Sequence, residues 1–265
     1  MIKIAFFGAA GKMGKRLVAL ATEDTEIEVV AALESSQSPD LGRDAGEVAG
    51  VGRIGVQITA SLDPAVSPDV IVDFSSARAF DAVEGLARER KIPLVYATTG
   101  ISDAEVARLE DLAKSVPVMR SPSMSPSVNL AMKLAQAAAK ALKDSDADVE
   151  IIERHHRYKV DAPSGTALKF GALIAKEMGI DSFRDGRSGR VGARPHNEIG
   201  YHAVRVGDNP GEHSIIFGML GETLEITVKS SNRDAYAHGA LAAAKFLAKQ
   251  APGRLYDMSD ALGLD

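Results

Sequence analysis

The stretch Ile2-Lys3-Ile4-Ala5-Phe6-Phe7-Gly8-Ala9-Ala10-Gly11-Lys12-Met13-Gly14 decides the fold of the amino-terminal half of this chain. Its apolar first part, residues 2–7, is typical of a buried strand, and residues 15–22 behind it have helical spacing. Gly8 can make the tight turn, Gly11 lets the backbone approach a pyrophosphate, and Gly14 allows the helix to pack closely on the strand. This order predicts a dinucleotide-binding unit with the phosphates at the helix N-terminus.

An acidic residue stands where such a unit needs one. Residues 28–33 read as a second strand, and Glu34 follows it about twenty residues beyond the glycine turn, where a carboxylate accepts the two ribose hydroxyls of an adenosine. Two serines and no arginine come after Glu34, so its charge should repel a 2′-phosphate and favour NADH over NADPH. Lys12 or Arg43 could soften this preference. The alternative is an ordinary βαβ unit with a solvated acid at the strand end.

Strands and helices continue to alternate through the amino-terminal half. We expect strands at residues 70–74, 93–97 and 117–119, helices at 77–88 and 102–114, and a glycine-rich loop at 40–55. Ser102 and Glu105 form a capping-box pattern at the start of the second helix. The alternation predicts a Rossmann-like doubly wound parallel sheet. The segments after its strands, Ser75-Ser76, Thr98 to Gly100 and Ser121 to Ser125, should open on the nicotinamide crevice.

The pattern changes in the second half, which we expect to form an α+β domain with a mostly antiparallel open sheet. Helices are predicted at 129–142 and 166–178, the latter with Gly179 as C-cap, and strands at 149–153, 199–205, 213–218 and 222–229. An Ala-rich helix at 235–250 should return to the first domain. The predicted domains are therefore 1–126 plus 235–265, which binds the dinucleotide, and 127–234, which binds substrate. The open sheet needs cover, which predicts a homo-oligomer built through the second domain.

The candidate catalytic loop is Glu153-Arg154-His155-His156-Arg157-Tyr158-Lys159-Val160-Asp161-Ala162-Pro163-Ser164-Gly165-Thr166-Ala167, between a strand and a helix. Its serine, glycine and threonine bring hydroxyls and free N–H groups to the helix start, which predicts an anion site. A histidine can donate a proton near neutral pH, and Lys159 can pair with a carboxylate or protonate a developing carbanion or enamine. A solvated basic turn is the alternative.

Composition limits the other possibilities. The chain has 265 residues and a formal net charge of −5, with both signs mixed along it, so we expect no nucleic-acid partner. It has no cysteine, which excludes disulfides and thiolate catalysis and agrees with a reducing cytoplasmic location. Apolar runs are too short for a membrane span. The remaining histidines, His196, His202, His213 and His238, are interpreted as structural, and we expect no metal site.

The sequence resembles the 4-hydroxy-tetrahydrodipicolinate reductase family, also called the dihydrodipicolinate reductase family, of the diaminopimelate route to lysine. The resemblance covers almost the whole length, and its most specific part is Lys159-Val160-Asp161-Ala162-Pro163-Ser164-Gly165-Thr166-Ala167. The other matching segments are Gly8 to Gly14, Thr98-Thr99-Gly100, Gly207-Asp208, Gly211-Glu212-His213 and Ser231-Asn232-Arg233.

The resemblance implies an NAD(P)H-dependent oxidoreductase that reduces a cyclic imine dicarboxylate, 4-hydroxy-tetrahydrodipicolinate, to tetrahydrodipicolinate, in a homotetramer. By this resemblance His155 is the proton donor and Lys159 the second catalytic group. His156, Lys159, Gly165 and Thr166 are expected to bind the substrate. The residues expected to hold the cofactor, NADH by preference or NADPH, are Gly8, Ala9, Ala10, Gly11, Lys12, Met13, Glu34, Phe74, Thr98, Thr99, Gly100, Ser121, Ser123, Met124, Arg233 and Tyr236.

The chain departs from the usual pattern of this family at two places. Ala97 stands where a glycine usually precedes Thr-Thr-Gly, and Ser123, Pro126 and Ser127 fall within a segment that usually reads Asn-x-Ser-x-Gly-x-Asn. The proline could change domain closure, and the missing asparagine amide could remove one contact of the nicotinamide loop. Two alternatives remain: an amino-acid or sugar dehydrogenase on the same plan, and a regulator that senses NADH without turning it over.

Overall fold

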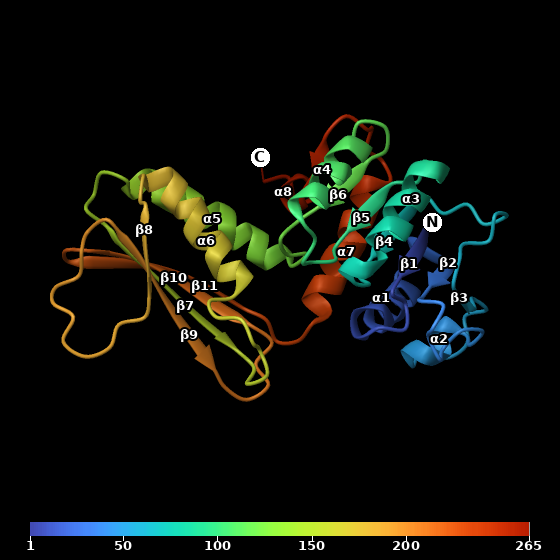
Figure 1. Ribbon diagram of the computed structural model, residues 1–265, viewed down its shortest axis with the longest axis horizontal. Helices are drawn as coiled ribbons and strands as arrows, with labels where there is room; N and C mark the ends of the chain where they lie inside the picture. Colours follow the sequence, from blue (N-terminus) through green and yellow to red (C-terminus); the bar gives the residue numbers. More distant parts are fainter. Residues whose placement is uncertain (265) are drawn as a thin grey trace. The chain divides into compact units, whose positions relative to one another are not determined.

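The computed structural model describes residues 1–264, which form two compact units. Unit 1 comprises Met1–Pro126 and the segment from Asp234 onward, and unit 2 comprises Ser127–Arg233. The chain therefore leaves unit 1 after residue 126 and re-enters it at residue 234 (Figure 1). The last part of the sequence thus completes the fold that the first part begins.

Unit 1 is built on a seven-stranded sheet in which every pairing is parallel. The strand order is β12-β6-β5-β4-β1-β2-β3, so the order reverses between β1 and β4. This confirms the doubly wound sheet, whose ligand crevice lies at such a reversal point. The strands are β1 (Ile2–Phe7), β2 (Ile27–Leu33), β3 (Ile58–Thr59), β4 (Val70–Asp73), β5 (Leu94–Tyr96), β6 (Val118–Arg120) and β12 (Leu255–Tyr256).

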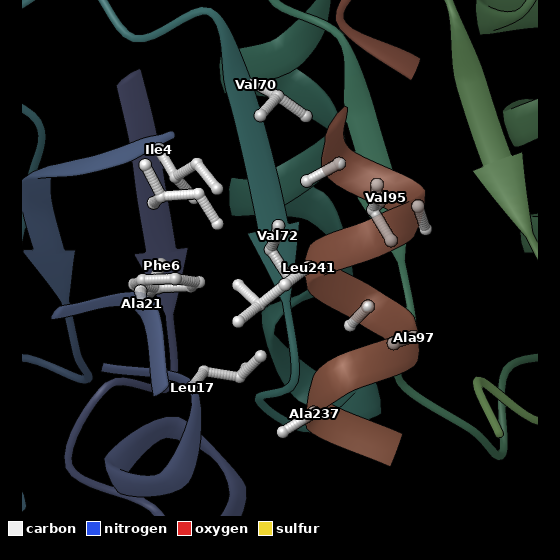
Figure 2. Close-up of a cluster of buried hydrophobic side chains, with 14 of the residues drawn as sticks. Ile4, Phe6, Leu17, Ala21, Val70, Val72, Val95, Ala97, Ala237 and Leu241 are labelled. Atoms are coloured by element: carbon white, nitrogen blue, oxygen red, sulfur yellow. The ribbon is translucent and has the colours of Figure 1, made fainter. Parts of the chain in front are cut away.

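Helices cover both faces of this sheet, and each face has its own buried core. Figure 2 shows one of them, where Leu241 and Ala237 of α7 pack over Val72 and Val95 of the sheet. The other face is covered by α3 and α4. The helices are α1 (Lys12–Glu23), α2 (Ala45–Ala49), α3 (Phe80–Arg90) preceded by a 3₁₀ turn (Ala77–Ala79), α4 (Asp103–Leu112), α7 (Asp234–Leu247) and α8 (Met258–Leu262).

Two local predictions in unit 1 have different outcomes. The capping box is confirmed, because Ser102 N–H donates to Glu105 Oε2 at 2.7 Å and Glu105 N–H donates to Ser102 Oγ at 3.3 Å. The loop expected at residues 40–55 is wrong in part, since it contains α2. Asp44 caps that helix and also accepts from the N–H groups of Ile54 and Gly55, so one buried carboxylate orders the whole segment.

Unit 2 is a five-stranded sheet with two helices on one face (Figure 1). The strand order is β11-β10-β7-β9-β8. Phe170 and Ile174 of α6 and Ala135 of α5 pack in its core against Ile151 and Phe217 of the sheet. The elements are α5 (Pro126–Leu142), β7 (Asp148–His155), α6 (Gly165–Met178), β8 (Ser182–Asp185), β9 (Glu198–Arg205), β10 (Glu212–Met219) and β11 (Glu222–Lys229).

The second sheet is mixed, and our expectation of a mostly antiparallel sheet needs correction. β10 runs antiparallel to β11 and to β7, but β9 runs parallel to both β7 and β8. The helix α6 lies between β7 and β8 in the chain, and a crossover through a helix is what a parallel neighbour requires. Strand β8 was missed because its four residues, Ser182–Asp185, are mostly exposed and show no apolar alternation.

A cluster of opposite charges lies at the partly exposed face of the second sheet. Glu150 accepts from Arg187 at 2.7 and 2.9 Å and from Arg194 at 2.8 Å, and His202 Nε2 lies 2.8 Å from the same carboxylate. The two arginines fasten the segment between β8 and β9 to the sheet.

No helix formed by residues 1–264 is both long and apolar enough to cross a bilayer.

Candidate active site

The glycine turn of unit 1 has the geometry that its sequence predicts. Gly8 has φ +75°, and a Cβ there would lie 2.8 Å from the Cα of Ser75. A Cβ at Gly14 would lie 2.0 Å from the carbonyl oxygen of Gly8, so helix α1 packs directly on the turn only because this residue has no side chain. Gly11 is the N-cap of α1 and offers no side chain to the first N–H groups, which stay available for an anion.

Glu34 is tied to the same turn. Its Oε2 accepts from the N–H of Ala10 at 3.1 Å, and its Oε1 accepts from the N–H of Ser35 at 2.9 Å. The carboxylate at the end of β2 is thus held next to the residues expected to bind the pyrophosphate. This is the place where a dinucleotide-binding unit presents an acid to the ribose.

A cavity of about 580 Å³ opens at the carboxyl ends of β1, β2 and β4. It has the size of a small-molecule pocket. An apolar floor and the carboxylate of Glu34 make it fit an adenosine. Its lining residues are Phe7, Gly8, Gly11, Glu34, Ser35, Ser36, Ala60, Phe74, Ser75, Ser76, Arg78, Ala79 and Ala82.

Arg78 is the residue of this cavity that sequence reasoning missed. The expectation of NADH preference rested on the absence of an arginine beside Glu34 in sequence. The structure nevertheless places Arg78, from the 3₁₀ turn that follows β4, in the lining of the cavity that Glu34 lines. Arg43, which we considered as a softening charge, is instead paired with the carboxylate of Asp40. The fold therefore brings a cation into the same cavity as the carboxylate of Glu34.

The loops expected at the nicotinamide leave β5 and β6, which are parallel neighbours in the sheet. Thr99 and Gly100 are exposed, Gly100 with φ +80°, whereas Ser121 and Ser123 are buried. The side chain of Met124 belongs to the hydrophobic core of unit 1, which leaves its backbone for any contact with a cofactor.

Five further residues of the cofactor prediction have these positions in the chain. Ala9 belongs to the core of unit 1, and Lys12 and Met13 open α1. Tyr236 lies in α7 and is partly buried against the core of unit 1, while Arg233 is the exposed last residue of unit 2. None of these five residues is among those lining the cavity.

In unit 2 the ring of the candidate catalytic histidine, His155, is hydrogen-bonded to the buried carboxylate of Glu153. His155 is 8% exposed and Glu153 only 1%, and His155 Nδ1 lies 2.6 Å from Glu153 Oε2. Burial would raise the pKa of Glu153, but hydrogen bonds from Arg205 and His155 outweigh it and leave that pKa below its usual value. Burial lowers the pKa of His155, and the neighbouring carboxylate of Glu153 offsets part of that effect.

The start of α6 carries the residues on which the predicted anion site rests. Ser164 is the N-cap, and its Oγ accepts from the N–H of Ala167 at 3.2 Å. Gly165 and Thr166 follow in the first turn, where N–H groups have no acceptor within the helix. The peptide bond before Pro163 is cis. The expected C-cap is confirmed, since Gly179 ends α6 with φ +74°.

The other two predicted substrate residues lie on the loop before α6. Lys159 Nζ donates to both oxygens of Asp161, at 2.7 and 2.9 Å. His156 is partly buried beside Tyr158, with ring centroids 6.3 Å apart, and its Nδ1 is buried without a hydrogen-bond partner among residues 1–264. Lys159 is therefore paired with a protein carboxylate on its own loop.

Four residues near His155 were not assigned a site role from sequence. Arg205 carries no local motif, Gly211 was noted only as part of a segment that matches the family, His213 was interpreted as structural, and Glu153 was read only as the end of a strand. The ring of His213 lies edge-on to that of His155, with centroids 5.2 Å apart. A Cβ at Gly211 would lie 3.0 Å from His155 Nε2, so glycine keeps the space beside that nitrogen free.

One signal for this cluster was present in the sequence. In β7 the residues that face the core alternate, and Glu153 and His155 continue the series begun by Val149 and Ile151. An acid on the buried face of a strand needs a partner, because a lone buried charge is costly. That partner, Arg205, comes from β9 and is 52 residues away in sequence.

Family models match both halves of the chain. The model described as "Dihydrodipicolinate reductase, N-terminus" matches residues 2–124, and the model described as "Dihydrodipicolinate reductase, C-terminus" matches residues 127–262. The chain belongs to the dihydrodipicolinate reductase family. The resemblance drawn from the sequence motifs is thereby confirmed, and the two matched segments meet at the boundary between unit 1 and unit 2.

Relatives over the full length support the same assignment. A 4-hydroxy-tetrahydrodipicolinate reductase of Rhodopirellula baltica is 51% identical over 99% of this chain and 96% of the relative. One of Alkalilimnicola ehrlichii is 44% identical over 99% of both chains. Among solved structures, a dipicolinate-bound dihydrodipicolinate reductase from Paenisporosarcina sp. TG-14 aligns with a TM-score of 0.77 at 26% identity, over 97% of each chain.

A more distant structural likeness concerns the fold alone. An amine dehydrogenase from Mycobacterium smegmatis aligns with a TM-score of 0.66 at 13% identity, over 96% of this chain and 94% of that one. The two-domain plan is thus shared with other dehydrogenases.

Proposed function

We propose that this chain reduces 4-hydroxy-tetrahydrodipicolinate with His155 as the proton donor and Lys159 as the second catalytic group. The reaction is that of its family, an NAD(P)H-dependent reduction in lysine biosynthesis. The observation that carries the assignment of roles is the position of His155. Its Nδ1 is hydrogen-bonded to the buried carboxylate of Glu153, and the same carboxylate accepts from the N–H of Ser164, the N-cap of α6.

The substrate of this family is a ring with two carboxylates, and the loop before α6 offers matching donors. We assign the N–H groups of Gly165 and Thr166, with the Thr166 hydroxyl, to one carboxylate, because a helix N-terminus attracts an anion. His156 and Lys159 supply further donors. The dipicolinate-bound relative from Paenisporosarcina supports this choice, since dipicolinate is also a six-membered nitrogen ring with two carboxylates. Fixing the ring in this way should contribute much of the rate.

His155 moves the proton through Nε2. The ionised carboxylate of Glu153 can only accept, so Nδ1 keeps its hydrogen and Nε2 is the atom that exchanges protons with a ligand. Burial lowers the pKa of His155, so the ring is neutral before substrate binds at neutral pH. The two negative charges of the substrate favour the protonated ring, which then donates at Nε2. Lys159 assists as a second positive charge once it leaves Asp161.

A reduced nicotinamide, when bound, supplies the hydride for this reaction. We assign its binding to the glycine turn, Glu34 and Phe74, with the Thr98 to Gly100 and Ser121 to Met124 loops and with Arg233 and Tyr236 as further contacts. NADH is the preferred form in this proposal, because Glu34 presents a carboxylate to the ribose hydroxyls. NADPH is also accepted, because Arg78 lines the same cavity and can neutralise a 2′-phosphate.

The assembly we propose is a homotetramer formed through unit 2. Its sheet has helices on one face only, and on the other face Val204, which pairs in the strand register with the exposed Arg154, is 40% exposed. An open sheet face of this kind is usually covered by another chain. Light scattering coupled to size-exclusion chromatography measures the mass directly. A monomer at micromolar concentration would refute this part.

The deciding experiment combines one substrate test with one substitution. Purified protein, NADH and the freshly made product of the preceding synthase are mixed, and loss of NADH absorbance is followed, with pyruvate and simple sugars as control substrates. We expect oxidation only with the cyclic imine. Oxidation with pyruvate or a sugar would instead indicate another dehydrogenase, and binding of NADH without turnover would indicate a sensor.

The substitution is His155→Gln, which should lower kcat by roughly two to four orders of magnitude, the usual range for a general acid, with little change in NADH affinity. His196→Gln is the matched control, because its ring is 78% exposed and paired only with Asp146, so its kcat should equal that of the wild type. Wild-type kcat in His155→Gln would remove the proposed proton donor.

A further inference from the structure

A single buried carboxylate connects all parts of the candidate catalytic cluster in unit 2. Glu153 accepts four hydrogen bonds: from Arg205 at 2.7 and 2.8 Å, from His155 Nδ1 at 2.6 Å and from the N–H of Ser164 at 3.0 Å. Both oxygens are shared, since Oε2 receives His155 and one nitrogen of Arg205, and Oε1 receives Ser164 and the other. The acid thus meets the proton donor and the substrate-binding helix at once.

The arrangement differs from an ordinary buried ion pair. A bidentate arginine already neutralises Glu153, so the fold alone does not need the contact to His155. Arg205 also donates to the carbonyl oxygen of Asp161 at 2.6 Å, which ties it to the residue that holds Lys159. Glu153 and Arg205 together therefore contact the proton donor, the cap of α6 and the loop that carries Lys159.

We propose that Glu153, held by Arg205, is the positioning residue of this reaction: it fixes His155 as the tautomer with hydrogen on Nδ1 and sets Nε2 beside Gly211, next to the start of α6. The proposal rests on the proposed function, because it gives Glu153 a role only if His155 donates the proton. Glu153 acts through His155 and the helix N-cap, and it does not itself touch the substrate.

The charged groups around the ring have opposing effects. Glu153 on β7 favours the imidazolium, while Arg205 on β9 and Lys159 on the loop oppose it, and His213 on β10 lies edge-on to the ring. Burial lowers the pKa of His213 to about 4, so this neighbour stays neutral near pH 7. Glu153 is therefore the acidic partner that stabilises the protonated form of His155, and Arg205 weakens that stabilisation.

This balance predicts opposite shifts for two substitutions. In Glu153→Gln the negative charge behind the ring is lost, so the alkaline limb of the kcat/KM profile, where His155 loses its proton, should move to lower pH. In Arg205→Met the carboxylate loses its cation, so the same limb should move to higher pH. We expect kcat of Glu153→Gln to fall roughly a hundredfold or more, in the range of general acid catalysis.

The matched control is Glu198→Gln. Glu198 is almost as buried as Glu153, at 5% against 1% exposed, and it is also paired with an arginine, Arg187 at 2.7 Å, but it lies at the end of β9 opposite to Arg205. Glu198→Gln should therefore reproduce any effect that comes only from the loss of a buried ion pair. We expect this variant to keep the wild-type pH profile and kcat.

The closing measurement needs no turnover. Nitrogen-15 NMR of the histidine rings in the ligand-free protein at pH 8, with the His155 signal assigned by its loss in His155→Gln, reports which nitrogen carries the hydrogen. We expect Nδ1–H in the wild type and a changed ring pattern in Glu153→Gln. An Nε2–H tautomer in the wild type, or pH limbs that do not move apart in the two variants, would overturn the positioning role.

These results separate the inference from the proposed function. If Glu153→Gln does not fold, the wild-type tautomer and the profile of Arg205→Met still decide. An active His155→Gln would refute the proton donor whatever the tautomer, whereas an Nε2–H tautomer with an inactive His155→Gln would refute only the role of Glu153.

Discussion

Lys159 and Asp161 are joined by a two-pronged ion pair, with Nζ 2.7 Å from Oδ1 and 2.9 Å from Oδ2. The lysine side chain is 21% exposed, and the hydrogen bond it donates lowers the pKa of the Asp161 carboxyl. Lys159 is therefore paired with a protein carboxylate, and in the proposed reaction a ligand carboxylate would have to take the place of Asp161.

Lys159→Ala should therefore damage both parameters. We expect KM for the cyclic imine to rise roughly ten- to a hundredfold, because a charged hydrogen bond to the substrate is worth roughly 1.5–3 kcal/mol, and kcat to fall as well. Steady-state kinetics with substrate varied at saturating NADH measures both. Lys169→Ala, on the exposed side of α6, is the control and should behave as wild type. Unchanged kinetics in Lys159→Ala would take the lysine out of the mechanism.

Glu34→Ala should weaken NADH more than NADPH. Loss of the carboxylate removes the acceptor for the ribose hydroxyls and, at the same time, the charge that repels a 2′-phosphate. We expect KM for NADH to rise by about tenfold, which corresponds to about 1.4 kcal/mol, with a smaller effect for NADPH. Cofactor titrations by fluorescence provide the two affinities.

Arg78→Ala is the matched counterpart of that substitution, because both side chains line one cavity with opposite charges. It should weaken NADPH more than NADH. Equal losses for both cofactors in Glu34→Ala would mean that Glu34 supports the turn through the N–H of Ala10 and does not read the ribose.

Gly14→Ala tests the close packing of α1 on the glycine turn. The added methyl would lie 2.0 Å from the carbonyl oxygen of Gly8, so the helix has to shift. We expect a loss of about 1–3 kcal/mol in the free energy of unfolding, the usual range for overpacking, together with weaker NADH binding. Gly85→Ala in α3 has open space around the new methyl and should be neutral or stabilising, since alanine is the better helix former. Urea unfolding of both variants distinguishes local crowding from a general intolerance of alanine.

His213 should make the protein less stable in mild acid. Burial lowers the pKa of His213 from 6.5 to about 4, so between these values the unfolded chain binds a proton that the folded chain does not. Acidification through that window therefore favours unfolding, by on the order of 3 kcal/mol in total. Chemical denaturation between pH 7.5 and 4.5 measures the slope. In His213→Gln this slope should become shallower, and a slope equal to that of the wild type would assign the acid sensitivity to other groups.

Sequence reasoning reached the features that depend on neighbouring residues. The glycine turn, the capping box at Ser102 and the C-cap at Gly179 are set by local backbone geometry, so their residues predict them directly. The alternation of strands and helices predicted the parallel sheet of unit 1 for the same reason. Short elements such as α2 and β12 were missed because five or two residues are too few to show a period.

Features that depend on distant residues could not be predicted from the sequence. Glu153 lies in the quoted catalytic loop, but an acid at the end of a strand is usually solvated, and only the fold brings Arg205 across from β9 to bury it. Arg78 likewise reaches the adenosine end because β4 lies next to β1 in the sheet. His213 was interpreted as structural, and the fold places its ring against His155 with its Nε2 on Ser164.

The return of the chain at Asp234 has a consequence for synthesis of the protein. Helix α7 contributes Ala237, Ala240, Leu241 and Leu247 to the core of unit 1, so the nascent amino-terminal segment leaves the ribosome with one side of its sheet covered only in part. All of unit 2 is translated before that helix appears. Unit 1 is thus begun first and completed last. A polypeptide truncated before residue 234 would expose the apolar surface that α7 covers to chaperones and proteases.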